Sequence, residues 1–152
     1  MESLVYKKAK EFKQKYPMTI AWRLKKHAKV VEQHLNPDEE VNYVFAAQKN
    51  DNPFDIITTY IVVLTNKRIL LAQKRLLFGY FFKAITPDMF NDLTVSMGLI
   101  WGKVHIDTIK EKVHLSNIQR DALDEIETNI TEYMMNEKQK YNNPEFNREG
   151  NM

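Results

Sequence analysis

The sequence of 152 residues contains no cysteine. This absence excludes a disulfide framework, a cysteine nucleophile, a zinc finger and a thiolate-bound iron–sulfur cluster, and it is compatible with a reducing cytosol. No apolar run reaches the roughly 18 residues of a membrane-spanning helix, and the first residues lack the apolar core of a secretory signal. We therefore expect a cytoplasmic protein without a transmembrane segment.

Recognisable catalytic motifs are also missing. The sequence has no G-x-S-x-G, P-loop or dinucleotide-binding motif, and no nucleophile–base pair can be named from it. Hydrophobic residues (43%) and charged residues (28%) are near ordinary globular usage, and the net charge of +2 is too small to indicate a nucleic-acid partner. We therefore expect a globular protein that is not an enzyme and has no nucleic-acid partner, cofactor or metal.

Positive charge is concentrated at the N-terminus. Residues 1–35 hold nine Lys or Arg and three Glu, a net charge of +6 that leaves −4 for the rest of the chain. Helical spacing predicts two helices here, ended by Pro17 and by Pro37. Their apolar stripes, each of which needs a partner, are Leu4, Val5, Ala9, Phe12 and Tyr16, then Ile20, Leu24, Ala28, Val31 and Leu35. We expect a basic extension over residues 1–36, a domain over 37–143 and a disordered tail over 144–152.

After residue 37 the apolar pattern changes to the two-residue period of β-strands. Segments rich in Ile, Val, Tyr, Phe and Thr alternate with turn residues. We expect seven strands, at residues 41–49, 57–65, 68–74, 80–85, 93–97, 103–108 and 112–115. The last hairpin has a self-consistent register, because apolar side chains share one face and opposite charges meet on the other. Its expected pairs are Val104–Leu115, Ile106–Val113, His105–His114 and Asp107–Lys112.

A long amphipathic helix is expected after the last strand. Residues from Ser116 to Gln119 fit a capping box, and Pro144 follows the end of the helix. The apolar stripe is Ile118, Ala122, Ile126, Ile130, Tyr133 and Met134. Seven antiparallel strands followed by one helix predict an α+β fold, in which the C-terminal helix caps a bent sheet or partly open barrel.

Two segments resemble bacterial pleckstrin-homology (PH-like) domains, the YokE-like group in particular. The first is VLTNKRILL at residues 63–71, a motif shared with GRAM domains, and its turn is formed by Thr65, Asn66, Lys67 and Arg68. The second is LTVSMGLIWGKVHI at residues 93–106, with Gly98 and Gly102 at the family's spacing. The resemblance covers about residues 38–135. It implies a seven-stranded PH-like fold and a non-enzymatic module that binds phosphoinositides, peptides or protein surfaces.

The first hairpin departs from the phosphoinositide-binding members of that family. Those members place a Lys-x(n)-Lys/Arg-x-Arg pattern across this hairpin. Here Lys49 is followed by Asp51 and Asp55, two carboxylates that would repel the phosphates. The departure argues against inositol-phosphate recognition at that position.

The turns after the first, third and fifth strands carry apolar residues where turns are usually polar. The first turn contains Phe54, and an up-and-down sheet would bring the three turns to one end. Such an exposed apolar patch is typical of an interaction surface, unless the strand ends are misplaced and these side chains are core. The candidate partner-binding residues of the other two turns are Lys74, Arg75, Leu77, Phe78, Leu99, Ile100, Trp101 and Lys103.

Three occupants of this apolar end are open alternatives: the N-terminal helices, another subunit or protein, and an anionic membrane surface. We favour a module that self-associates or binds a protein through the apolar end or a sheet edge. Its supports are the apolar turns and the two helical stripes that lack a partner. The alternative is peripheral binding to anionic lipid through the basic helices and the turns. The two differ in salt dependence, because salt screens lysine–lipid attraction.

The remaining polar clusters favour structural interpretations. His105 and His114 form a cross-strand pair, but a zinc site needs three or four ligands and no third is evident. We interpret His27 and His34 as a solvated or interfacial face of the second helix. The acidic run Asp38-Glu39-Glu40 reads as solvated charge at a helix–strand junction.

Overall fold

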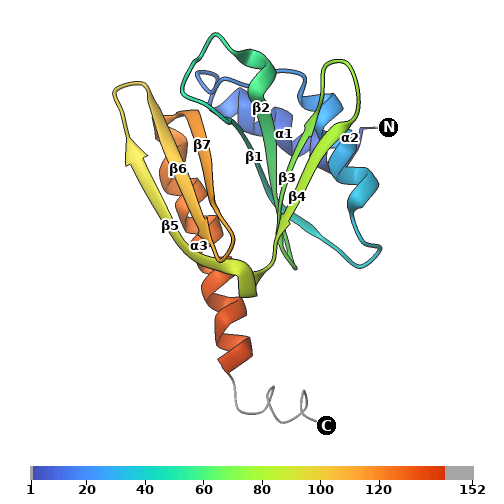
Figure 1. The fold of residues 1–152 in the computed structure, drawn as a ribbon, viewed down its shortest axis with the longest axis vertical. Coiled ribbons are helices and arrows are strands. Elements are labelled where there is room, and N and C mark those ends of the chain that lie inside the picture. Colours follow the sequence, from blue (N-terminus) through green and yellow to red (C-terminus); the bar gives the residue numbers. More distant parts are fainter. Residues whose placement is uncertain (1, 143–152) are drawn as a thin grey trace.

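The computed structural model describes residues 2–142 (Figure 1). Within these residues, three helices and seven strands follow one another, with single 3-10 turns before β2, β5 and α3. The helices are α1 (Leu4–Lys15), α2 (Leu24–His34) and α3 (Leu123–Asn142). The strands are β1 (Val41–Gln48), β2 (Thr59–Thr65), β3 (Ile69–Lys74), β4 (Tyr80–Ile85), β5 (Phe90–Met97), β6 (Trp101–Thr108) and β7 (Lys112–Gln119).

All seven strands join one antiparallel sheet in the order β4-β3-β2-β1-β7-β6-β5. The sheet bends sharply between β1 and β7, because these two strands pair only at Gln48 and Ser116. Figure 1 shows the result as two splayed halves, β1–β4 and β5–β7. The expected α+β fold with a bent seven-stranded sheet is confirmed.

The main core fills the space between the two halves, and α3 covers it. Phe45 and Leu71 come from one half, Ile106 and Leu115 from the other, and Ile126 from α3; all are buried. Buried and half-buried residues alternate along β6, because one face of the strand points to the core and the other away from it. The C-terminal helix therefore acts as the cap that the sequence predicts.

The helices α1 and α2 pack on the outer face of β1–β4, where Figure 1 also places them. Val5 and Ala9 of α1 and Val31 of α2 lie in one cluster with Val63 and Leu70 of the sheet. The sequence left open what the two stripes pack against, and the structure shows that they dock on their own domain. Every residue of β2 is buried, so the strand is covered on both faces. Its outer apolar side chains are partners of Val5, Ala9, Ala28 and Val31, whereas Phe12 and Tyr16 of the first stripe belong to the main core.

The expected capping box at Ser116 is also wrong. Residues 116–119 continue β7, and Gly102 of β6 pairs with Ile118. The Ser116 hydroxyl lies 3.2 Å from the carbonyl oxygen of Gln48, to which it donates, and so supports the β1–β7 contact instead of a helix start. Pairing with β6 thus prolongs the strand, and α3 begins at Leu123.

The hairpin register predicted for β6 and β7 is confirmed at every pair. Val104 lies opposite Leu115 and Ile106 opposite Val113; the polar face carries the pairs His105–His114 and Asp107–Lys112. Local patterning was sufficient here because a shift by one residue would move every apolar side chain to the solvent face.

Gly102 provides the clearest packing constraint on the position of α3. A Cβ at this position would overlap Cδ1 of the buried Leu123. We expect Gly102→Ala to lower the free energy of unfolding by about 1–3 kcal/mol, because the side chain of Leu123 must move in a filled core. Denaturant titration measures this difference. An alanine variant as stable as the wild type would contradict the close approach of β6 and α3.

Candidate functional site

The motif Thr65-Asn66-Lys67-Arg68 forms the β2–β3 turn and holds the segment that joins α2 to β1. Arg68 donates from Nε and Nη2 to the two carboxylate oxygens of Glu39, at 2.8 and 2.9 Å. Nη2 also donates to the carbonyl oxygen of His34 at 2.9 Å. The Glu39 side chain is fully buried, so its expected role as solvated charge is wrong.

The other members of the motif bind the same segment. The Asn66 side chain accepts a hydrogen bond from the N–H of Glu40 at 2.8 Å, and Lys67 pairs with Asp38. The Thr65 hydroxyl lies 2.7 Å from the Glu39 carboxylate and donates to it. The resemblance motif therefore has a structural role in this chain.

We call the contacts of Thr65, Asn66, Lys67 and Arg68 with residues 34–40 the clamp. Acid should weaken the clamp by protonating Glu39. Burial alone would raise the pKa of Glu39, but hydrogen bonds from Arg68 and Thr65 outweigh it and hold the pKa at about 2, below its ordinary value of 4.5. Stability from this group is present above pH 4.5 and is lost as the pH falls toward 2, by about 3 kcal/mol in all. Unfolding measured between pH 5 and 2 should show a steeper loss for the wild type than for Glu39→Gln. Equal slopes would contradict the assignment.

Three apolar turns project at one end of the sheet, as expected. We call this surface the apolar end: residues 54–57 between β1 and β2, 76–78 between β3 and β4, and 99–101 between β5 and β6. Figure 1 shows the three connections at the same end of the molecule. Phe54 is 90% exposed, Phe78 85% and Leu99 87%, so these side chains are not core.

The linker between α1 and α2 also lies at this end, which sequence reasoning missed. The indole Nε1 of Trp101 donates to the carbonyl oxygen of Met18 at 2.7 Å, and the N–H of Trp22 donates to the Thr59 hydroxyl at 3.2 Å. Arg23 Nη1 donates to the carbonyl oxygen of Lys74 at 3.4 Å. The available signal was Met18 and Trp22, two apolar residues after Pro17 that belong to neither helical stripe.

Basic side chains accompany the apolar turns. Lys74 and Arg75 precede the β3–β4 turn, and the backbone N–H of Arg120 donates to the carbonyl oxygen of Ile100 at 3.0 Å, which places this basic residue next to the β5–β6 turn. Lys103 lies 3.1 Å from Asp51, to which it is paired. The expected site residues of the β3–β4 and β5–β6 turns therefore lie at one end of the sheet. The positive charge of Lys103 is partly neutralised there by Asp51.

His27 supports the base of the β3–β4 turn from α2. The N–H of Lys74 donates to its Nδ1 at 2.8 Å, so the neutral ring carries its proton on Nε2. Burial lowers the pKa of His27 to about 4. Of the two expected surroundings, solvated or interfacial, the structure shows the interfacial one for His27, because the buried ring lies between α2 and β3. His34 stacks on Phe82 at 4.2 Å between ring centroids.

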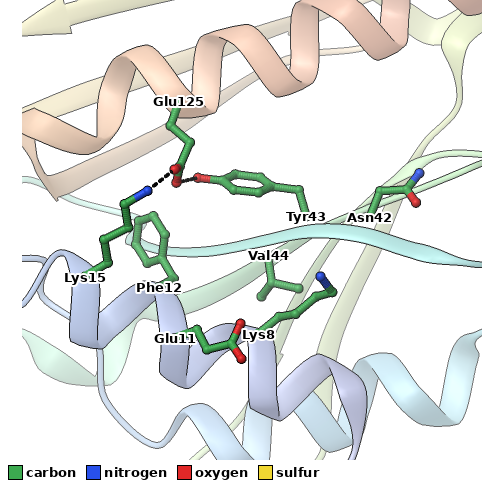
Figure 2. Close-up of a pocket in the computed structure, with 8 residues that line it drawn as sticks. All are labelled: Lys8, Glu11, Phe12, Lys15, Asn42, Tyr43, Val44 and Glu125. Carbon is green, nitrogen blue, oxygen red and sulfur yellow. Dashed lines mark hydrogen bonds and ion pairs between the residues drawn. The ribbon is translucent and has the colours of Figure 1, made fainter.

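Among the hollows of the described residues, two that lie away from the turns are bordered by ion pairs. One lies between β4 and β7, and about 820 Å³ of open space is bordered by Tyr60, Phe81 and Lys83, with Lys83 paired across it to Glu111. Figure 2 shows the other, of about 450 Å³, between α1 and α3 over β1. There Glu125 accepts from Tyr43 and pairs with Lys15, both at 2.6 Å. These contacts join α1 to α3.

The cross-strand histidines bind each other and the first turn. His105 Nε2 lies 2.7 Å from His114 Nδ1, and His114 Nε2 lies 2.9 Å from Asp51. Burial lowers the pKa of His105, and the nearby His114 adds to this. Among residues 2–142 no group of three His, Cys, Asp or Glu side chains could hold a metal ion. The expected disordered tail, residues 144–152, lies outside the described residues.

Comparison with known proteins gives one family and two structural likenesses. The model of the bacterial PH domain family matches residues 35–132. A crystal structure of a DUF1696 family protein with a pleckstrin-homology domain from Shewanella loihica PV-4 has a TM-score of 0.42 and 15% identity, over 72% of this chain and 90% of that chain. A pleckstrin homology domain from Shewanella amazonensis SB2B has a TM-score of 0.43 and 15% identity, over 68% and 80%. No curated protein matches the chain.

Proposed function

The chain belongs to the bacterial PH domain family, and from this premise we propose a non-catalytic module that binds the surface of an anionic membrane through its apolar end. The observation that carries the proposal is that the three turns of the apolar end expose large apolar side chains and have basic side chains beside them. No helix within residues 2–142 is long and apolar enough to cross a bilayer. The proposed attachment is therefore peripheral.

In this proposal the apolar side chains of the turns insert into the membrane, and the basic side chains beside them bind the anionic headgroups. Phe78 and Leu77 at the β3–β4 turn are nearly free of protein contacts, so insertion into the headgroup region removes their apolar surface from water. Lys74 and Arg75 at the base of the same turn would then face anionic headgroups. Each basic residue near such a surface contributes about 1 kcal/mol, less at high salt.

The sequence suggests that the basic N-terminal helices bind anionic lipid directly, whereas in this proposal they do not insert into the membrane. Their apolar stripes already cover β1–β4, so they cannot insert without exposing the sheet. Their lysines supply general positive charge, and their linker adds Met18 and Trp22 to the apolar end. Insertion is assigned to the turns alone.

Self-association or protein binding through the apolar end is the second candidate. One of its two supports is lost, because the helical stripes are buried in their own domain. The observation that favours it is the pairing of Lys103 with Asp51, which leaves less free positive charge for lipid. An apolar protein contact would persist in high salt, whereas lipid binding would weaken.

Vesicle flotation of the full chain tests the proposal. We expect flotation with vesicles containing anionic phosphatidylserine at low salt, less flotation at high salt and little with neutral phosphatidylcholine. No flotation with anionic vesicles at low salt would reject the membrane proposal. If sedimentation at the same time showed salt-resistant self-association that depends on the turns, the second candidate would replace it.

A further inference from the structure

The two outer edges of the sheet are protected to different degrees. At the β4 edge, Lys83 lies in the middle of the strand and α2 packs nearby, with His34 stacked on Phe82. At the other edge, β5 contains no Lys, Arg or Pro and pairs only with β6 among the described strands. Among the described residues, Figure 1 shows no helix or strand beside the outer edge of β5. An unprotected edge strand presents a row of backbone groups that another strand can pair with.

The backbone geometry shows which residues of β5 face outward. The N–H of Leu93 donates to the side chain of Asp92 at 2.8 Å, so it is not part of the ladder with β6. The N–H of Gly98 donates to the carbonyl oxygen of Trp101 at 2.9 Å and therefore faces β6. Since successive residues of a strand alternate in direction, the outward groups belong to Leu93, Val95 and Met97.

We propose that β5 pairs antiparallel with β5 of a second copy of this chain, about a two-fold axis at Val95. The outward backbone groups of Val95 then bond to those of Val95 of the second copy, and Leu93 pairs with Met97. Leu93, Val95 and Met97 are not among the residues of the apolar end, so the proposal does not rest on membrane binding. Such a contact is isologous and closes as a dimer.

The sequence of β5 is self-complementary in this register. Leu93, Val95 and Met97 lie on one face and meet only one another across the axis. On the other face, Thr94 lies opposite Ser96 of the second copy. Asp92, the only charged residue of the strand, lies opposite Gly98, so no like charges meet directly. A register centred on Thr94 would instead place Asn91 opposite Met97.

The absence of cysteine allows single introduced cysteines to report this register. In the proposed pair, residues 95 of the two copies have Cα atoms about 5.5 Å apart, within the range of a disulfide. Residues 94 of the two copies are diagonal neighbours at roughly 7–8 Å, beyond that range. We expect Val95→Cys to form a disulfide dimer at least ten times faster than Thr94→Cys under mild oxidation. Circular dichroism of the reduced variants shows whether both are folded.

Sedimentation of the cysteine-free full chain gives a second measurement. We expect a reversible monomer–dimer equilibrium that persists at high salt. Faster cross-linking of Thr94→Cys would overturn the Val95 register. Equal slow cross-linking of both folded variants, with a wild type that remains monomeric at high concentration, would overturn the dimer.

Discussion

Replacing Arg68 by alanine is expected to lower the free energy of unfolding by about 3–5 kcal/mol. The substitution leaves the carboxylate of Glu39 buried without its two charge-assisted hydrogen bonds and removes a donor from the carbonyl oxygen of His34. Removing one partner of a buried ion pair is costly because the other charge stays away from water. A single domain is stable by only about 5–15 kcal/mol, so the variant should be partly unfolded near 37 °C. Denaturant titration at 25 °C measures the effect.

Lys67→Ala is the matched control for this experiment. Lys67 is adjacent in the same turn and pairs with Asp38, but both side chains are exposed. An exposed pair contributes roughly 0–1 kcal/mol, so this variant should be nearly as stable as the wild type. Equal losses for the two variants would show that the turn itself, and not the buried pair, determines stability.

The double substitution Leu77→Ser and Phe78→Ser should reduce affinity for anionic vesicles about 100-fold. Each large apolar side chain contributes roughly 1.5–3 kcal/mol when fully removed from water, and partial insertion of both supplies about 3 kcal/mol. Both residues are more than four-fifths exposed (82% and 85%), so folding should be unaffected. Vesicle titration followed by sedimentation measures the affinity.

Ile109→Ser is the control for the turn substitutions. Ile109 is 62% exposed in the β6–β7 turn, which lies at the opposite end of the sheet in Figure 1. The substitution removes an exposed apolar side chain, as the substitutions at Leu77 and Phe78 do, but it leaves the apolar end unchanged. If Ile109→Ser weakened binding as much as the double variant, vesicle binding would be a general surface property.

Local patterns predicted most of the fold. The strands were found because a two-residue period reports which face is buried, and the β6–β7 register followed from matching faces. Their ends differ where tertiary pairing extends a strand, as β6 does for β7 beyond Leu115. The turn motif was recognised, but its function as a clamp depends on Glu39, which is 29 residues away from Arg68.

Only the part of the candidate site that depends on local patterns was predicted. The exposed apolar patch could be predicted from the sequence, because apolar residues occupy turn positions, and turn residues are usually polar and lie at the surface. The contribution of the α1–α2 linker and the burial of His27 depend on helices docking over β1–β4. Docking of that kind joins residues far apart in the sequence, and no local period reports it.

Quenching of tryptophan fluorescence by brominated lipids tests the central claim most directly. The sequence has two tryptophans, Trp22 and Trp101, and both lie at the apolar end. With anionic vesicles at low salt, we predict a blue shift and strong quenching when the bromine atoms lie near the headgroup end of the acyl chains. Bound protein without quenching would contradict the proposal, because it would place the apolar end away from the membrane.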